Sequence, residues 1–164
     1  MTVDRFNALP AAEAQRELMA CCASGEWARR VADGRPYPDM ADLLVAAGQA
    51  LADLPWEQVA LALAAHPRIG ERPAGNGREA AWSRREQSGV ATADRSTLAA
   101  LAQANREYEQ RFGHVFLIFA SGATADRMLT AARQRLRHDP DTERRVVRAD
   151  LARIVALRVE RMVS

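Results

Sequence analysis

Apolar residues recur at intervals of three and four along almost the whole 164-residue chain, the spacing that gives a helix one apolar face. Proline, glycine and N-cap residues divide this pattern into successive segments. The sequence therefore predicts an all-α fold. The predicted helices lie at residues 10–22, 27–33, 40–54, 55–66, 78–89, 94–112, 124–137 and 141–162.

One segment breaks the helical pattern. Residues 115–120 form a continuous apolar run, Val-Phe-Leu-Ile-Phe-Ala, which predicts a short buried strand or an extended segment. Such a run most often belongs to the core. If it is extended and unpaired, its backbone N–H and C=O groups need partners, and a ligand can be one of them. We expect a single-domain bundle of helices with one short extended apolar segment.

Length and charge narrow the class of protein. A chain of this length predicts one globular domain over residues 1–164. Its net charge of +2 is far from the dense basic patch of a nucleic-acid-binding protein. The chain opens on no signal peptide and has no run near the roughly 20 apolar residues that span a bilayer, so we expect a cytoplasmic protein without membrane association. Cys21 and Cys22 are adjacent and are expected to stay reduced.

The sequence lacks the residues that several kinds of catalysis require. All 23 basic residues are arginine, so the chain has no lysine to form a Schiff base. The 3 histidines, His66, His114 and His138, do not have the spacing of a zinc site, so no metal is expected. The two glycine-rich motifs that bind nucleotides, G-x-G-x-x-G and G-x-x-x-x-G-K-S/T, do not occur. The sequence thus gives no support for a lysine, metal or nucleotide mechanism.

His66 precedes Pro67, and the pair ends a predicted helix beside the glycine-rich loop at residues 70–77. One interpretation is a capping imidazole that interacts with the last helix carbonyls. The other is a general acid or base, because an imidazole titrates near neutral pH and the loop gives it access to solvent. The residues alone do not separate the two interpretations.

A polar face near the end of the helix predicted at residues 78–89 carries Ser83, Glu86 and Gln87. Trp82 marks the buried side of the same helix. The polar face is either solvated or a hydrogen-bonding wall, in which a hydroxyl, a carboxylate and an amide recognise a small polar molecule.

The arginine-rich final stretch, residues 127–161, alternates basic and acidic residues, which predicts a mostly solvated, salt-bridged helix surface. Arg158 is the exception, because its neighbours along the chain are largely apolar. A guanidinium buried there needs an anionic or carbonyl partner.

Three separated motifs carry a family resemblance: HPRIGE at residues 66–71, SRREQSG at 83–89 and FGHVFLIFASG at 112–122. With this order and spacing, the sequence resembles the 2-oxo-4-hydroxy-4-carboxy-5-ureidoimidazoline (OHCU) decarboxylase family of the urate degradation pathway. Further matches are Phe6-Asn7, Trp27, Arg35-Pro36, Asn105, Tyr108 and the Arg158 segment.

The resemblance implies an all-α homodimer without a cofactor that converts a small ureidoimidazoline to (S)-allantoin and carbon dioxide, the third step of urate degradation. It implies that His66 is the catalytic histidine and that Glu86 contacts the substrate as the other candidate for proton transfer. The substrate-binding residues that it implies are Pro67, Ser83, Gln87, Phe116, Leu117, Ile118, Phe119, Ala120 and Arg158.

Two alternatives stand beside this interpretation. A catalytically silent helical scaffold that binds a urate-pathway enzyme would be expected to lose its polar motif residues, whereas His66, Glu86, Gln87 and Arg158 are all present. A related enzyme acting on another ureido or imidazoline acid would use the same hydrogen-bonding wall. Turnover of related ureides distinguishes the second alternative.

Overall fold

The computed structural model describes residues 1–71 and 77–164, and every regular element in these ranges is a helix. The predicted all-α fold is therefore confirmed. Most of the loop predicted at residues 70–77 lies outside the described residues. The helices are α1 (Val3–Asn7), α2 (Ala11–Cys21), α3 (Gly25–Asp33), α4 (Met40–Ala52), α5 (Trp56–Ala64), α6 (Arg78–Glu86), the 3₁₀ helix η1 (Ser88–Val90), α7 (Arg95–Phe112), α8 (Ala125–Arg135) and α9 (Pro140–Val163).

The observed helix ends differ from the predicted ones by a few residues, and the differences have local causes. α5 ends at Ala64 and not at His66, because the backbone N–H of His66 donates to the Leu63 carbonyl at 2.9 Å in a tighter, 3₁₀-type turn. α1 was not predicted, since its 5 residues are too few to show a helical period.

Two compact units make up the chain. The first comprises residues 1–62 and 152–164, and the second comprises residues 63–151. α9 therefore contributes its first half to the second unit and its second half to the first. All three sequence motifs belong to the second unit, whereas Arg158 belongs to the first.

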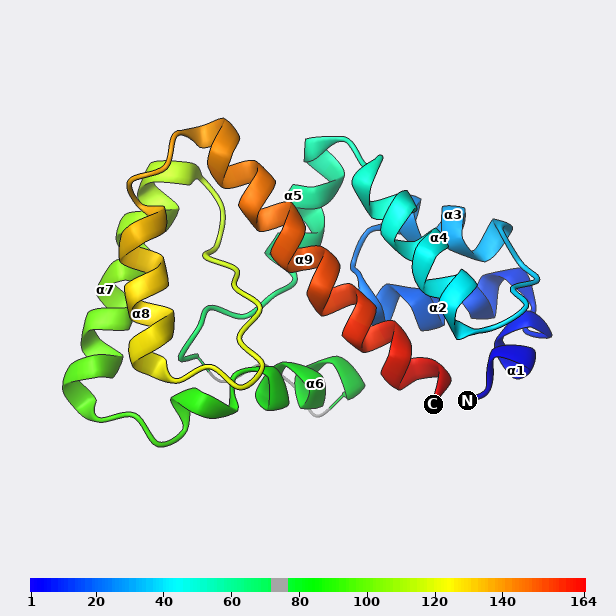
Figure 1. The fold of residues 1–164 in the computed structure, drawn as a ribbon, viewed down its shortest axis with the longest axis horizontal. Coiled ribbons are helices and arrows are strands. Elements are labelled where there is room, and N and C mark those ends of the chain that lie inside the picture. Colours follow the sequence, from blue (N-terminus) through cyan, green and yellow to red (C-terminus); the bar gives the residue numbers. More distant parts are fainter. Residues whose placement is uncertain (72–76) are drawn as a thin grey trace. The chain divides into compact units, whose positions relative to one another are not determined.

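In the first unit, α3 packs against both α2 and α4 (Figure 1). The Trp27 side chain is fully buried, and its indole N–H donates to the Ala47 carbonyl at 3.0 Å. Cys21 and Cys22 are buried in this unit and carry thiols rather than a disulfide, as their adjacency predicted. The Met1 amine donates to a carbonyl near the end of α9, so both chain ends belong to the fold of this unit.

In the second unit, α7 and α8 lie side by side and run in the same direction (Figure 1). The 18 residues of α7 span about 27 Å at roughly 1.5 Å per residue. An extended chain covers that distance in about eight residues at roughly 3.3 Å each. Because α7 and α8 run in the same direction, the chain must travel back along α7 before α8 begins, and residues 113–124 do so. This explains why the apolar run at residues 115–120 is extended. The run forms no strand in the described structure, so the extended interpretation is the one confirmed.

The core of the second unit is built from α7, α8, the extended run and one residue of the loop that follows His66. It therefore holds the run and the loop against the helix pair. Its buried residues are Ile69, Leu101, Ala104, Tyr108, Phe116, Ala120, Met128, Leu129 and Ala132.

The prediction of a solvated surface for the arginine-rich final stretch is wrong at two positions. Arg135 and Glu143 are 6% and 0% exposed. Both occupy apolar-face positions of their helices, since Arg135 follows Met128 and Ala132 at helical spacing and Glu143 precedes Val147 by four residues. A charge is buried at such a position only when a partner compensates it.

Candidate functional site

The loop that follows His66 is held by the end of α6. The side-chain oxygen of Gln87 accepts a hydrogen bond from the backbone N–H of Gly70 at 3.1 Å. Gly70 has a φ of 91°, a left-handed conformation that glycine adopts without steric strain. This hydrogen bond joins the first motif, through Gly70, to the second motif, through Gln87.

Ile69 joins the same loop to the third motif. Its side chain packs in one core cluster with Phe116 and Ala120. Its carbonyl accepts a hydrogen bond from Nδ2 of Asn105 on α7 at 2.9 Å, and Asn105 is only 3% exposed. The three motifs, which are far apart in sequence, therefore meet around one loop.

Gly89 of the second motif lies close to the backbone just after the third motif. It lies in η1, where a Cβ added to it would stand 1.9 Å from the carbonyl oxygen of Ala123. A backbone oxygen cannot move aside by changing rotamer. This close approach therefore requires glycine.

Gly89→Ala is expected to lower the free energy of unfolding by about 1–3 kcal/mol, the usual cost of forcing extra volume into a packed site. Gly48 on α4 offers the matched control, because a Cβ there meets nothing within 4 Å. Gly48→Ala should raise the free energy of unfolding by about 0.5–1 kcal/mol through helix propensity. Urea denaturation measures both, and a Gly89 variant as stable as the parent would contradict the close approach.

Two polar residues near the end of α6 are shielded from solvent. Ser83 and Glu86 are 6% and 7% exposed, similar to Trp82 at 7%. A solvated face is therefore the wrong interpretation for Ser83 and Glu86. Gln87 is half-buried at the C-cap of the helix. Because buried polar groups need hydrogen-bonding partners, Ser83 and Glu86 lie among groups that can bond to them.

His66 and Pro67 are half-buried just beyond the end of α5. The proline disfavours a helical conformation at His66, which explains why the helix stops before it. The next residue, Arg68, forms a two-point ion pair with Glu109 of α7, at 2.5 and 2.9 Å. The loop is thus anchored to α7, while the adjacent imidazole keeps partial access to solvent.

Two pockets border the loop at residues 68–71. One of ≈ 380 Å³ lies against α7 and is lined by Arg68, Asn105 and Glu109 among others. The other, of ≈ 450 Å³, lies against the end of α6 and is lined by Gln87 among others. Both volumes are in the range of small-molecule sites.

The extended run belongs to the core, as its composition predicted. Phe116, Leu117 and Ala120 are buried, and Ile118 and Phe119 are half-buried. The carbonyl of Leu117 accepts a hydrogen bond from a buried side chain on α8, at 2.7 Å. A side chain, and not a neighbouring strand, therefore satisfies this backbone group.

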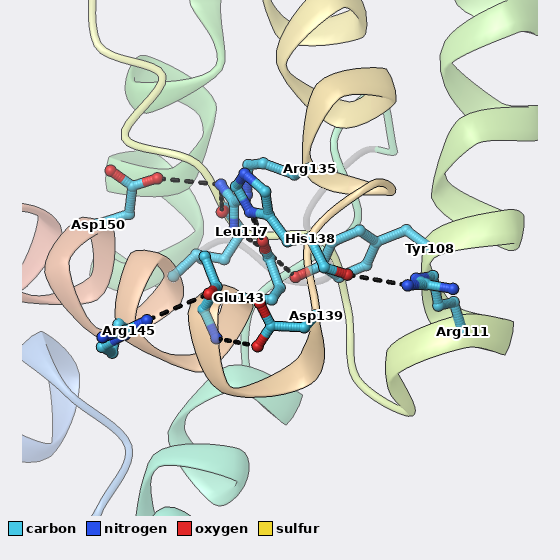
Figure 2. A network of polar contacts seen from close by, with 10 residues as sticks. Tyr108, Arg111, Leu117, Arg135, His138, Asp139, Glu143, Arg145 and Asp150 are labelled. Carbon is cyan, nitrogen blue, oxygen red and sulfur yellow. Dashed lines mark hydrogen bonds and ion pairs between the residues drawn. The ribbon is translucent and has the colours of Figure 1, made fainter.

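That side chain is Arg135, which lies at the centre of a buried polar network (Figure 2). Its Nε donates to Oε1 of Glu143 at 2.7 Å, and its Nη1 donates to Oδ2 of Asp150 at 3.1 Å. Glu143 also accepts from the Tyr108 hydroxyl at 2.5 Å and lies 2.8 Å from Nδ1 of His138. Burial and the Glu143 acceptor raise the pKa of Tyr108, so its hydroxyl stays protonated and donates.

Arg158 is 5% exposed on α9, which confirms its predicted burial. Burial raises the pKa of the Cys22 thiol to about 12, and the Ser24 backbone and the charge of Arg158 oppose part of that rise. Cys22 is therefore a neutral thiol at neutral pH and supplies no negative charge to Arg158.

The described part of the chain shows neither a cluster of metal ligands nor a helix that could span a membrane. Within residues 1–71 and 77–164, no three His, Cys, Asp or Glu side chains are placed to hold a metal ion. None of the helices in these ranges combines the length and the apolar composition that a bilayer crossing requires.

A solved structure of an OHCU decarboxylase, crystallised in the presence of (S)-allantoin, has the same fold. It matches with a TM-score of 0.79 at 27% sequence identity, over 90% of this chain and 96% of that one. The helices and the three converging motifs thus place the chain in the class of all-helical OHCU decarboxylase folds.

Sequence comparison agrees with the fold. The uric acid degradation bifunctional protein TTL of Arabidopsis thaliana is 32% identical over an alignment of 156 residues that covers 90% of this chain and 47% of that protein. The chain thus spans about half the length of this plant relative. The OHCU decarboxylase of Amia calva is 28% identical over 139 residues, covering 84% of this chain and 79% of that one. The family model of OHCU decarboxylases matches residues 7–160, and the chain belongs to this family, as its motifs predicted.

Proposed function

We propose that this chain, with residues 1–164 acting as one functional domain, decarboxylates OHCU to (S)-allantoin and carbon dioxide. One observation carries the proposal: the three family motifs meet around the loop that follows His66, through Gln87 on one side and Ile69 on the other. The family match over residues 7–160 supports the same reaction.

The substrate can accept the electrons that decarboxylation releases. Its carboxylate is attached to a carbon that also bears a hydroxyl and adjoins an imine-like ring carbon. When the carbon–carbon bond to the carboxylate breaks, its electron pair forms a double bond to that ring carbon, and the imine electrons pass to nitrogen. A proton added to one face of the planar intermediate gives a single enantiomer. The protein must therefore orient the ring and move protons.

In this proposal, His66 transfers the proton. The imidazole takes or polarises the proton of the substrate hydroxyl as carbon dioxide leaves. Glu86 is the other candidate for delivering the proton that sets the stereochemistry. The half-buried position of His66 beside an anchored loop and the burial of Glu86 support these roles.

In this proposal, the groups around the substrate orient it. Ser83 and Gln87 bind from the end of α6, and Pro67 lines the site. The backbone of residues 116–120 and the guanidinium of Arg158 orient the polar ring and the ureido group. The burial of Ser83 and of Arg158 supports these roles, since hydrogen bonds shielded from water discriminate most strongly between ligands.

The test is near-UV circular dichroism of OHCU made in place from urate by urate oxidase and hydroxyisourate hydrolase. With this protein present, a chiral allantoin signal should grow quickly. Without it, slow spontaneous decay should give racemic allantoin. No acceleration would contradict the proposal and favour the silent scaffold, and a parallel assay of related ureides would reveal a different substrate.

We also propose a cytoplasmic homodimer that works without a cofactor and has no nucleic-acid or membrane partner. The family resemblance supports the dimer and the lack of a cofactor, and the net charge of +2 is consistent with a small-molecule partner. Light scattering after size exclusion should give twice the 18.0 kDa of one chain, and a monomer would contradict the dimer.

A further inference from the structure

We infer that Arg135 is a positioning residue that fixes the backbone of residues 116–120 for substrate binding. The inference rests on the proposed function, in which this run orients the substrate. No strand of the described structure pairs with the run, so its backbone geometry depends on contacts from side chains.

Arg135 contacts two consecutive residues of the run. Its Nη1 donates to the Leu117 carbonyl at 2.7 Å. Its guanidinium carbon lies 4.8 Å from the centroid of the Phe116 ring, within cation–π range. One rigid group thus holds both the backbone and the preceding side chain.

The guanidinium is itself held in place. Arg135 is 6% exposed, and its Nε and Nη1 are bonded to Glu143 and Asp150, as Figure 2 shows. Charge-assisted hydrogen bonds in a site shielded from water are the strongest and most directional that side chains make. Lysine would keep the charge but cannot reproduce the planar fork.

Fixing the Leu117 carbonyl also fixes the N–H of Ile118. The two groups belong to one planar peptide unit and point in opposite directions across it. Because the carbonyl is directed at Arg135, the N–H is directed to the other side of the run. Arg135 thereby determines where the run can offer a backbone donor to a ligand.

The test compares Arg135→Lys with two matched variants. Tyr108→Phe removes the hydroxyl bond to Glu143 but leaves the bond between Arg135 and Leu117 intact. Arg133→Lys makes the same chemical change at an exposed position of α8. The measurements are KM and kcat for OHCU, urea denaturation, and amide hydrogen exchange of residues 116–120.

Arg135→Lys should raise KM at least about tenfold and change kcat less than about threefold, because it loosens substrate binding without removing a reacting group. Exchange in residues 116–120 should quicken. Tyr108→Phe should lose stability with KM unchanged, and Arg133→Lys should behave like the parent. If Arg135→Lys does not fold, Asp150→Asn, which weakens the hold on the same guanidinium, should raise KM in the same direction.

An unchanged KM in a folded Arg135→Lys protein would overturn the inference, as would an equal rise in KM for Tyr108→Phe, which would indicate general destabilisation. In both cases the parent protein would still turn over OHCU, so the proposed function would stand. A parent protein that does not turn over OHCU would instead refute the proposed function and, with it, the positioning role.

Discussion

His66→Ala is expected to reduce kcat for OHCU decarboxylation by about 10²–10⁴-fold, the usual contribution of a positioned acid–base group. The imidazole is half-buried beyond the end of α5, and the buried side chain of Ile69 holds this loop in the core. The variant should therefore fold like the parent. The rate of appearance of the chiral allantoin signal measures the loss, and urea denaturation checks the fold.

Arg29→Gln is the control for this prediction, because it changes an exposed arginine of α3, outside the three motifs. It breaks the exposed pair with Asp33, and such surface pairs contribute no more than about 1 kcal/mol. The control should keep kcat near the parent value. A folded His66→Ala protein with full stereoselective turnover would contradict the proton-transfer role of His66, while the proposed reaction would remain supported by the parent protein.

The helices could be predicted from the sequence because their signals are local. Asp94 caps α7 through the backbone N–H of Thr97, and Gly113 ends the helix in a left-handed conformation, both as the residue types predicted. The buried network was missed because charge composition dominated the interpretation of the final helices. The position of Arg135 on an apolar face was the available signal, and it should have outweighed the alternating charges.

The site could be predicted only in part. The residue types at 66–71 and 83–89 predict acid–base and hydrogen-bonding groups, whereas the contacts that bring the motifs together depend on packing. The bond from Gly70 to Gln87 and the approach of Gly89 to Ala123 join segments that have no mutual spacing rule. Whether the polar face of α6 was solvated or buried likewise depended on what packed against it.

Glu143→Ala is expected to lower the free energy of unfolding by about 3–5 kcal/mol, the cost of breaking a buried ion pair from one side. The carboxylate is 0% exposed and accepts hydrogen bonds from Arg135 and Tyr108. Its loss leaves a buried guanidinium with one fewer anionic partner and a buried phenol without its acceptor. Urea denaturation at neutral pH measures the change. The slope of the unfolding free energy against urea concentration is compared with that of the parent protein, to detect a less compact native state.

Three companion variants separate charge from volume in this prediction. Glu143→Gln keeps the shape and one acceptor oxygen, so it should cost less than alanine. Glu160→Ala, at an exposed position of α9, should stay within about 0.5 kcal/mol of the parent. Arg135→Met combined with Glu143→Leu removes both charges and should be less destabilised than the sum of the single changes, because no unpaired charge stays buried. Strict additivity would show that the two side chains stabilise the unit independently.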